Sequence, residues 1–93
     1  MFKKIIRKML IAEKKNYDDI ELYILDRRAD LNLSVDMFRI HFRNDNCERY
    51  MADARRIGAI ADDIDEYLVD LRNSAKRINA YRKLLGLKKM KEA

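Results

Sequence analysis

The sequence predicts an all-α protein organised around one long C-terminal helix, from about residue 46 to residue 85. From Cys47 to Leu85, residues that could be buried recur in regularly alternating steps of three and four. Arg82 keeps this spacing but is the one residue of the series that is not suited to burial. This 3.5-residue period places one apolar seam along a helix. The 93 residues include no proline and two glycines, and 40% are charged, a balance typical of long helices and coiled coils. We therefore expect short N-terminal helices packed on the long helix, as a helical bundle or a coiled-coil dimer.

The length of the chain suits one small helical domain spanning residues 1–93. Within it we expect four segments, which are a basic amphipathic helix at 1–15, short helices at 16–44, the long helix at 45–86 and a basic tail at 87–93.

The first helix is predicted from apolar residues at helical spacing, with lysine and arginine on the opposite side. These apolar residues are Phe2, Ile5, Ile6, Met9 and Leu10. A basic amphipathic helix of this kind can cover the core of a bundle or lie on an anionic membrane surface. We favour the bundle.

The segment from 16 to 44 is the most ambiguous. Asn16 is a plausible N-cap for a second helix and Ser34 for a third. Residues 20–25 and 37–43 also alternate apolar and polar side chains, as strands do. We favour helices, because the charges of the second segment suit a helix dipole and no tight-turn residues follow it.

Residues 44–46 form the clearest break in the chain. Asp45 followed by Glu48 resembles a capping box that opens the long helix. A second break could fall at 72–74, where Ser74 is a possible cap, but the apolar seam continues in phase through it. Gly86 is expected to end the helix in a left-handed conformation, and residues 88–93 to fray.

The seam also predicts a second copy of the chain. The first 45 residues, divided into short helices, would cover only part of a helix about 60 Å long. A homodimer, antiparallel so that basic and acidic segments meet, would cover the rest. The expected oligomer interface consists of Ala54, Ile57, Ala61, Ile64, Leu68, Leu71, Ala75 and Ile78.

Charge is distributed unevenly along the sequence. The net charge of +5 divides into +5 for residues 1–15, −7 for residues 16–71 and +7 for residues 72–93. Two interpretations remain open. The basic ends can fold against an acidic middle, or they can form a surface for nucleic acid or acidic lipid.

The basic C-terminal part is the candidate nucleic-acid interface. Residues 66–87 have some likeness to a helix-turn-helix unit with its turn at 72–74, although the usual turn glycine is missing. Without a turn, the same residues still form a helix end rich in side chains suited to phosphate and base contacts. The predicted nucleic-acid-binding residues are Arg72, Lys76, Arg77, Asn79, Tyr81, Arg82 and Lys83.

Catalytic chemistry is not indicated. The carboxylates between Asp62 and Asp70 imitate half of a magnesium site but lack a second acidic pair, so we interpret them as a solvated face. His41 and Cys47 could form a base and nucleophile, yet no group to orient the base is apparent. We therefore expect no enzyme, no metal and no cofactor. One cysteine fits a reducing compartment, and no apolar run spans a bilayer, so we expect a cytoplasmic protein.

Three functions are compatible with these features. The first is a small dimeric protein that binds nucleic acid through its basic termini, in a regulatory or accessory role. The second is a protein–protein interaction module such as an adaptor or stoichiometric inhibitor. The third is a peripheral membrane protein attached through residues 2–11. A steep salt dependence of nucleic-acid binding would distinguish the first from the others.

Overall fold

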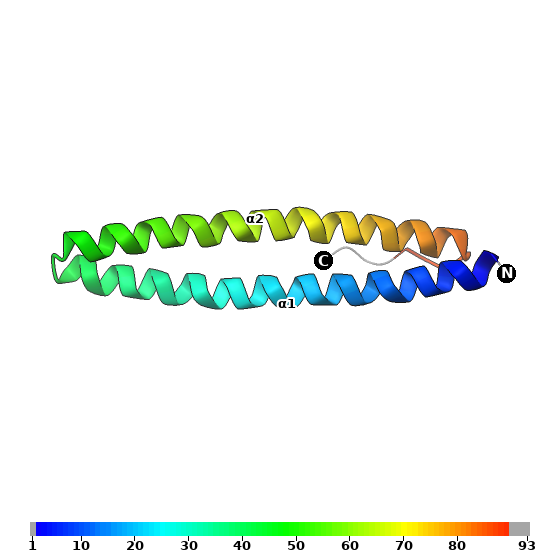
Figure 1. Ribbon diagram of the computed structural model, residues 1–93, viewed down its shortest axis with the longest axis horizontal. Helices are drawn as coiled ribbons and strands as arrows, with labels where there is room; N and C mark the ends of the chain where they lie inside the picture. Colours follow the sequence, from blue (N-terminus) through cyan, green and yellow to red (C-terminus); the bar gives the residue numbers. More distant parts are fainter. Residues whose placement is uncertain (1, 90–93) are drawn as a thin grey trace. The chain divides into compact units, whose positions relative to one another are not determined.

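The computed structural model describes residues 2–89. It contains two α-helices, α1 from Phe2 to Arg43 and α2 from Cys47 to Leu84, and no strand in the described range (Figure 1). The all-α prediction is confirmed. The long C-terminal helix is also confirmed, and residues 20–25 and 37–43 are helical rather than extended.

The short N-terminal helices are not present, because α1 is one helix of 42 residues. Neither glycine nor proline occurs before Gly58, so nothing in this stretch forces the backbone out of the helix. Asn16 lies inside α1, where its side-chain Nδ2 donates a hydrogen bond to Glu13 Oε2 at 2.8 Å instead of capping a new helix. Ser34 is buried within the same helix.

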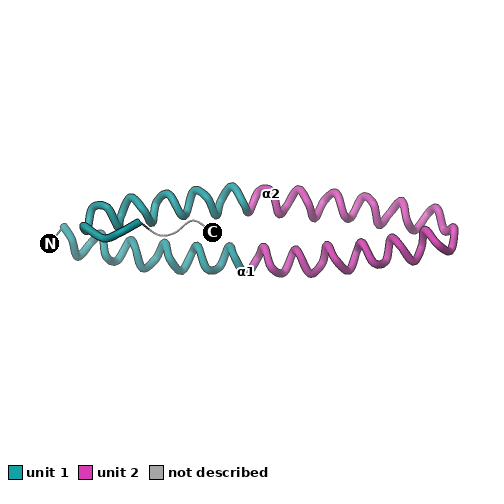
Figure 2. The backbone as a smooth tube through the Cα atoms, turned by 180° about the vertical axis from the view of Figure 1, so that it is seen from behind, with its two compact units in different colours: residues 1–22, 68–93 teal, residues 23–67 magenta. Residues whose placement is uncertain are grey.

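The contacts divide the chain into two compact units. Unit 1 consists of Met1–Leu22 and Leu68–Ala93, and unit 2 of Tyr23–Tyr67. In unit 1 the first part of α1 and the last part of α2 lie side by side in opposite directions (Figure 2). Unit 2 is a helical hairpin that contains the turn between α1 and α2.

The turn in unit 2 follows from cap residues at both helix ends. Asp45 has a φ of 55° and ends α1 in the left-handed conformation. The Asn46 N–H donates to His41 O at 2.9 Å and the Asp45 N–H to Phe42 O at 3.1 Å, the two bonds of a Schellman motif. Asn46 then caps α2, because its Oδ1 accepts from the Arg49 N–H at 3.3 Å. The predicted cap at Asp45 is therefore wrong by one residue.

The end of α2 repeats this motif as predicted. Gly86 has a φ of 72°, its N–H donates to Lys83 O at 3.1 Å, and the Leu87 N–H donates to Arg82 O at 2.8 Å. Most of the predicted frayed tail lies outside the described residues. No turn occurs at 72–74, so the likeness to a helix-turn-helix unit does not extend to the structure. Ser74 is fully buried within α2 instead.

Each helix has a seam of buried and half-buried residues at a 3.5-residue period, and we assign these residues heptad positions a and d. On α1 the seam is Ile6, Leu10, Glu13, Tyr17, Ile20, Ile24, Arg27, Leu31, Ser34, Phe38 and His41. On α2 it is Tyr50, Asp53, Ile57, Ile60, Ile64, Tyr67, Leu71, Ser74, Ile78 and Tyr81, and Leu85 continues the period just after the helix ends.

The seam observed on α2 shares every second residue with the predicted one. Ile57, Ile64, Leu71 and Ile78 occupy a positions, as expected, but the d positions carry Ile60, Tyr67, Ser74 and Tyr81. The predicted alternates Ala54, Ala61, Leu68 and Ala75 lie at the neighbouring e position, where Ala75 is buried and Ala61 half-buried, but Ala54 is exposed and Leu68 is 44% exposed. Burying isoleucine and tyrosine removes more apolar area from water than burying alanine, which favours the observed rotation of the helix.

Candidate nucleic-acid interface

The predicted nucleic-acid-binding residues all lie in unit 1, but the structure gives them different surroundings. Arg72, Lys76 and Lys83 are exposed on α2. Asn79, Tyr81 and Arg82 are half-buried. Arg82 Nε donates to the Lys88 carbonyl oxygen just beyond the helix end, so this side chain also closes the C-terminus of α2.

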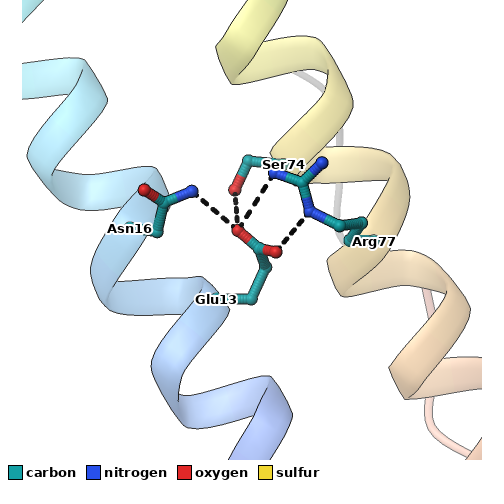
Figure 3. Close-up of polar contacts among 4 residues, drawn as sticks. All are labelled: Glu13, Asn16, Ser74 and Arg77. Atoms are coloured by element: carbon teal, nitrogen blue, oxygen red, sulfur yellow. Dashed lines mark hydrogen bonds and ion pairs between the residues drawn. The ribbon is translucent and has the colours of Figure 1, made fainter.

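Arg77 is held by Glu13 across the seam of unit 1 (Figure 3). Its Nε donates to Glu13 Oε1, and its Nη2 lies 3.4 Å from Glu13 Oε2. Ser74 Oγ donates to the same Oε2 at 2.8 Å, and Asn16 adds a further bond from α1. Four polar side chains therefore satisfy one another at a position where a coiled coil would ordinarily place apolar groups.

The cluster changes the protonation of its carboxylate. The hydrogen bond from Arg77 holds the pKa of Glu13 below its ordinary value of 4.5, although burial of the side chain opposes this effect. The same bond raises the pKa of Arg77. Arg77 thus acts within the fold, and it is a weaker candidate for phosphate contact than its exposed neighbours.

The first helical segment adds exposed cations to the same unit. Arg7 and Lys14 occupy e positions on α1, directly after seam residues Ile6 and Glu13. In an antiparallel pair of helices the e positions of both helices flank the same edge of the seam. Arg7, Lys14 and Arg82 lie on this side of unit 1, and the exposed Arg72, Lys76 and Lys83 lie next to it on the outer surface of α2. We call these six residues together the basic edge.

Charge is segregated between the two units. Unit 1 carries 14 lysines and arginines against six aspartates and glutamates, a net charge of +8. Unit 2 carries seven arginines against ten carboxylates, a net charge of −3. The Lys and Arg residues of unit 1 come from both helices, so its positive charge is contributed by the N-terminal and the C-terminal basic segments together.

Unit 2 contains two polar contacts across its own seam. His41 Nδ1 pairs with Asp53 Oδ2, and both side chains are largely buried. Arg27 pairs with Asp30 on α1, and its Nη1 lies 3.9 Å from Asp63 Oδ2 on α2. Asp53 is thus the orienting group for His41 that the sequence did not reveal.

Within residues 2–89, no group of three or more His, Cys, Asp or Glu residues is placed to hold a metal ion. Neither helix of this range combines the length and apolar character needed to cross a bilayer.

The sequence analysis did not predict that Glu13 and Ser74 lie in the seam between the helices. Their signal was weak, because a carboxylate and a hydroxyl in a helical repeat resemble solvent-facing residues until the other helix is placed. The α1 seam itself was detectable, since Ile6, Leu10, Tyr17, Ile20 and Ile24 share its period.

Comparison with known proteins gave no match to a family model, a curated protein or a solved structure.

Proposed function

We propose that the protein is a small non-enzymatic helical protein that binds nucleic acid through the basic edge of unit 1, in a regulatory or accessory role. The observation that supports this proposal best is the net charge of +8 on unit 1, with exposed cations contributed by both helices. Such a surface attracts phosphates through release of condensed counterions, which needs no particular base sequence.

The arrangement of the basic edge suits a backbone contact more than a base reader. Lys76 and Lys83 are separated by seven residues on one helix, and Lys14 adds a charge from the other. Lysine and arginine side chains at such spacing can follow successive phosphates. Tyr81 is half-buried in the seam, so it is a weaker candidate for base stacking than its position in the sequence suggested.

The test compares two pairs of cation-to-alanine substitutions. Lys14→Ala with Lys76→Ala removes one e and one f cation from unit 1. Arg28→Ala with Arg55→Ala removes the corresponding e and f cations from unit 2, all four side chains being exposed. The first pair is expected to weaken binding to every duplex and single strand alike and to reduce the magnitude of the salt slope by about two units.

The control pair should leave both the affinity and the slope nearly unchanged. Equal losses in the two double variants would mean that binding depends on total charge and not on unit 1. Absence of salt-dependent binding by the wild-type protein, measured by fluorescence anisotropy at low ionic strength, would exclude the proposed function altogether.

A further inference from the structure

Unit 1 has an edge formed by exposed apolar residues from both of its helical segments. Phe2 and Met9 occupy g positions on α1, and Ile5 lies beside them at a c position. Leu84 occupies a g position at the end of α2. The g positions of two antiparallel helices flank the same edge of the seam, opposite the edge that the e positions flank. These four side chains are between 43% and 70% exposed, and we call them the apolar edge.

The end of unit 1 that carries the apolar edge has only positive charges. Residues 2–12 and 71–89 contain eleven lysines and arginines and no aspartate or glutamate. Among them, Lys8 on α1 and Lys83 on α2 are exposed at f positions, on the outer surfaces that border the apolar edge from either side. Lysine side chains can lie along apolar surface while their ammonium groups remain in a polar layer. The apolar edge is therefore bordered by cations on both helices.

We propose that the apolar edge of unit 1 binds the surface of an anionic lipid bilayer. Phe2, Ile5 and Leu84 enter the boundary between headgroups and acyl chains, and the bordering lysines contact the anionic headgroups. Such an interfacial contact needs no helix that crosses the bilayer. The side chains that enter the bilayer are not part of the basic edge, so this inference does not rest on the proposed nucleic-acid function.

The charge of this end favours a lipid surface over other occupants of the apolar edge. A second copy in a two-fold contact would set the edge against itself and bring two sets of eleven cations together, which repel. A nucleic-acid duplex complements the charge, but its phosphates offer no apolar surface to Phe2 or Ile5. A flat anionic bilayer provides both an apolar layer and negative charge on either side of the edge.

The first experiment compares two pairs of substitutions, each with one residue from either helix. Ile5→Gln with Leu84→Gln makes the apolar edge polar. Ile11→Gln with Val69→Gln is the matched control, because these residues of unit 1 are 69% and 55% exposed but occupy b and f positions, away from the apolar edge. Sedimentation with vesicles of phosphatidylserine and phosphatidylcholine should show equal binding of wild type and control, and about tenfold weaker binding of the edge variant.

Three results would overturn the proposal. The first is a wild-type protein that does not bind the anionic vesicles, including one that instead forms a dimer which the edge variant dissociates. The second is equal binding of the wild type to vesicles of phosphatidylcholine alone, because the cations would then have no role. The third is an equal loss of binding in the two variants, with circular dichroism verifying that their helices remain formed.

Duplex binding by the same proteins separates this inference from the proposed function. Neither pair of substitutions changes a charge, so both variants should keep the duplex affinity and the salt slope of the wild type. A wild type that binds duplex but not anionic vesicles would overturn this inference and leave the proposed function intact. Binding to anionic vesicles without binding to nucleic acid would support this inference and exclude the proposed function.

The second experiment locates the side chains that enter the bilayer. The sequence contains no tryptophan, so Phe2→Trp and Ile11→Trp each introduce a single fluorophore on α1. The emission of the Phe2→Trp protein should shift to shorter wavelength on addition of anionic vesicles and be quenched by lipids brominated in their acyl chains, because the indole enters the interface. The Ile11→Trp protein should show neither change. Quenching of Ile11→Trp without quenching of Phe2→Trp would contradict the proposed contact.

Discussion

Glu13 shows how a single polar residue can be accommodated in a helix seam. Its side chain is 12% exposed and accepts bonds from Ser74, Asn16 and Arg77. A buried carboxylate without such partners would destabilise the fold, because no hydrogen bond would offset the free energy lost when the charge is removed from water. The partners come from both helices of unit 1, so the cluster also helps to specify their alignment.

Glu13 should make the stability of the protein depend on pH. Because Arg77 holds the pKa of Glu13 below its value of 4.5 in the unfolded chain, the unfolded state takes up a proton first as the pH falls. The stabilisation is complete above the unfolded-state pKa of 4.5. It is lost as the pH falls through the lower pKa that Glu13 has in the folded protein. Glu13→Gln should therefore lower the free energy of unfolding by about 1 kcal/mol at pH 7.

Urea denaturation at pH 7 and pH 3 would measure this effect. The difference between wild type and Glu13→Gln should shrink at pH 3, because protonation of Glu13 in the unfolded chain below its ordinary pKa of 4.5 reduces the stabilisation that the Arg77 pair provides. Glu66→Gln, at an exposed position of unit 2, should show no such difference at either pH. A Glu13→Gln effect of equal size at both pH values would contradict the role of the Arg77 pair.

Asp45 is a second residue whose role depends on its backbone. It occupies the left-handed region at a φ of 55°, which glycine adopts without a steric penalty. Asp45→Gly should therefore raise the free energy of unfolding by about 0.5 to 1 kcal/mol. Gly86→Ala, at the equivalent position after α2 with a φ of 72°, should lower it by about 1 kcal/mol.

Thermal denaturation of these two variants would test the cap geometry. The two changes in melting temperature should have opposite signs. A loss of stability in Asp45→Gly would mean that its carboxylate stabilises the turn by more than its backbone strain costs.

At the scale of the helices, the rotation of α2 decides which residues form the core. Ile60 is 4% exposed and lies in the observed seam, whereas Leu68 is 44% exposed and belongs only to the predicted one. Ile60→Ala should lower the free energy of unfolding by about 2 to 5 kcal/mol, through lost burial and the cavity that remains. Leu68→Ala should cost about 1 kcal/mol or less, because much of its side chain is already in water.

Chemical denaturation of the two variants separates the two seams. Comparable losses would indicate that the e position of α2 is as well covered in solution as the d position. Such a result would point to a further contact that covers the e position of α2.

The length of α1 removes the original reason for expecting a dimer. With 42 residues in α1 and 38 in α2, each helix has a segment of the other beside it in both units. The predicted interface residues Ile57, Ile64, Leu71 and Ile78 are buried or half-buried by α1 of the same chain.

For the whole molecule, the charge is segregated, because unit 1 carries a net charge of +8 and unit 2 a net charge of −3. A polyanion is therefore expected to be attracted to unit 1 and not to unit 2.

The sequence by itself determined the all-α class, the extent of α2, its glycine cap and the uneven charge. These follow from local properties. The period of the seam, the absence of proline and the glycine at position 86 can be recognised in the sequence without knowing what the helix packs against. Only the tertiary structure decided that α1 is continuous, that Glu13 and Ser74 lie inward, and that α2 turns Ile60 rather than Ala61 to its neighbour. Asn16, Ser34 and Glu13 are equally compatible with a helix end and a helix interior. Their roles depend on which side chains from the other helix lie within hydrogen-bond distance, and the linear sequence does not contain that information.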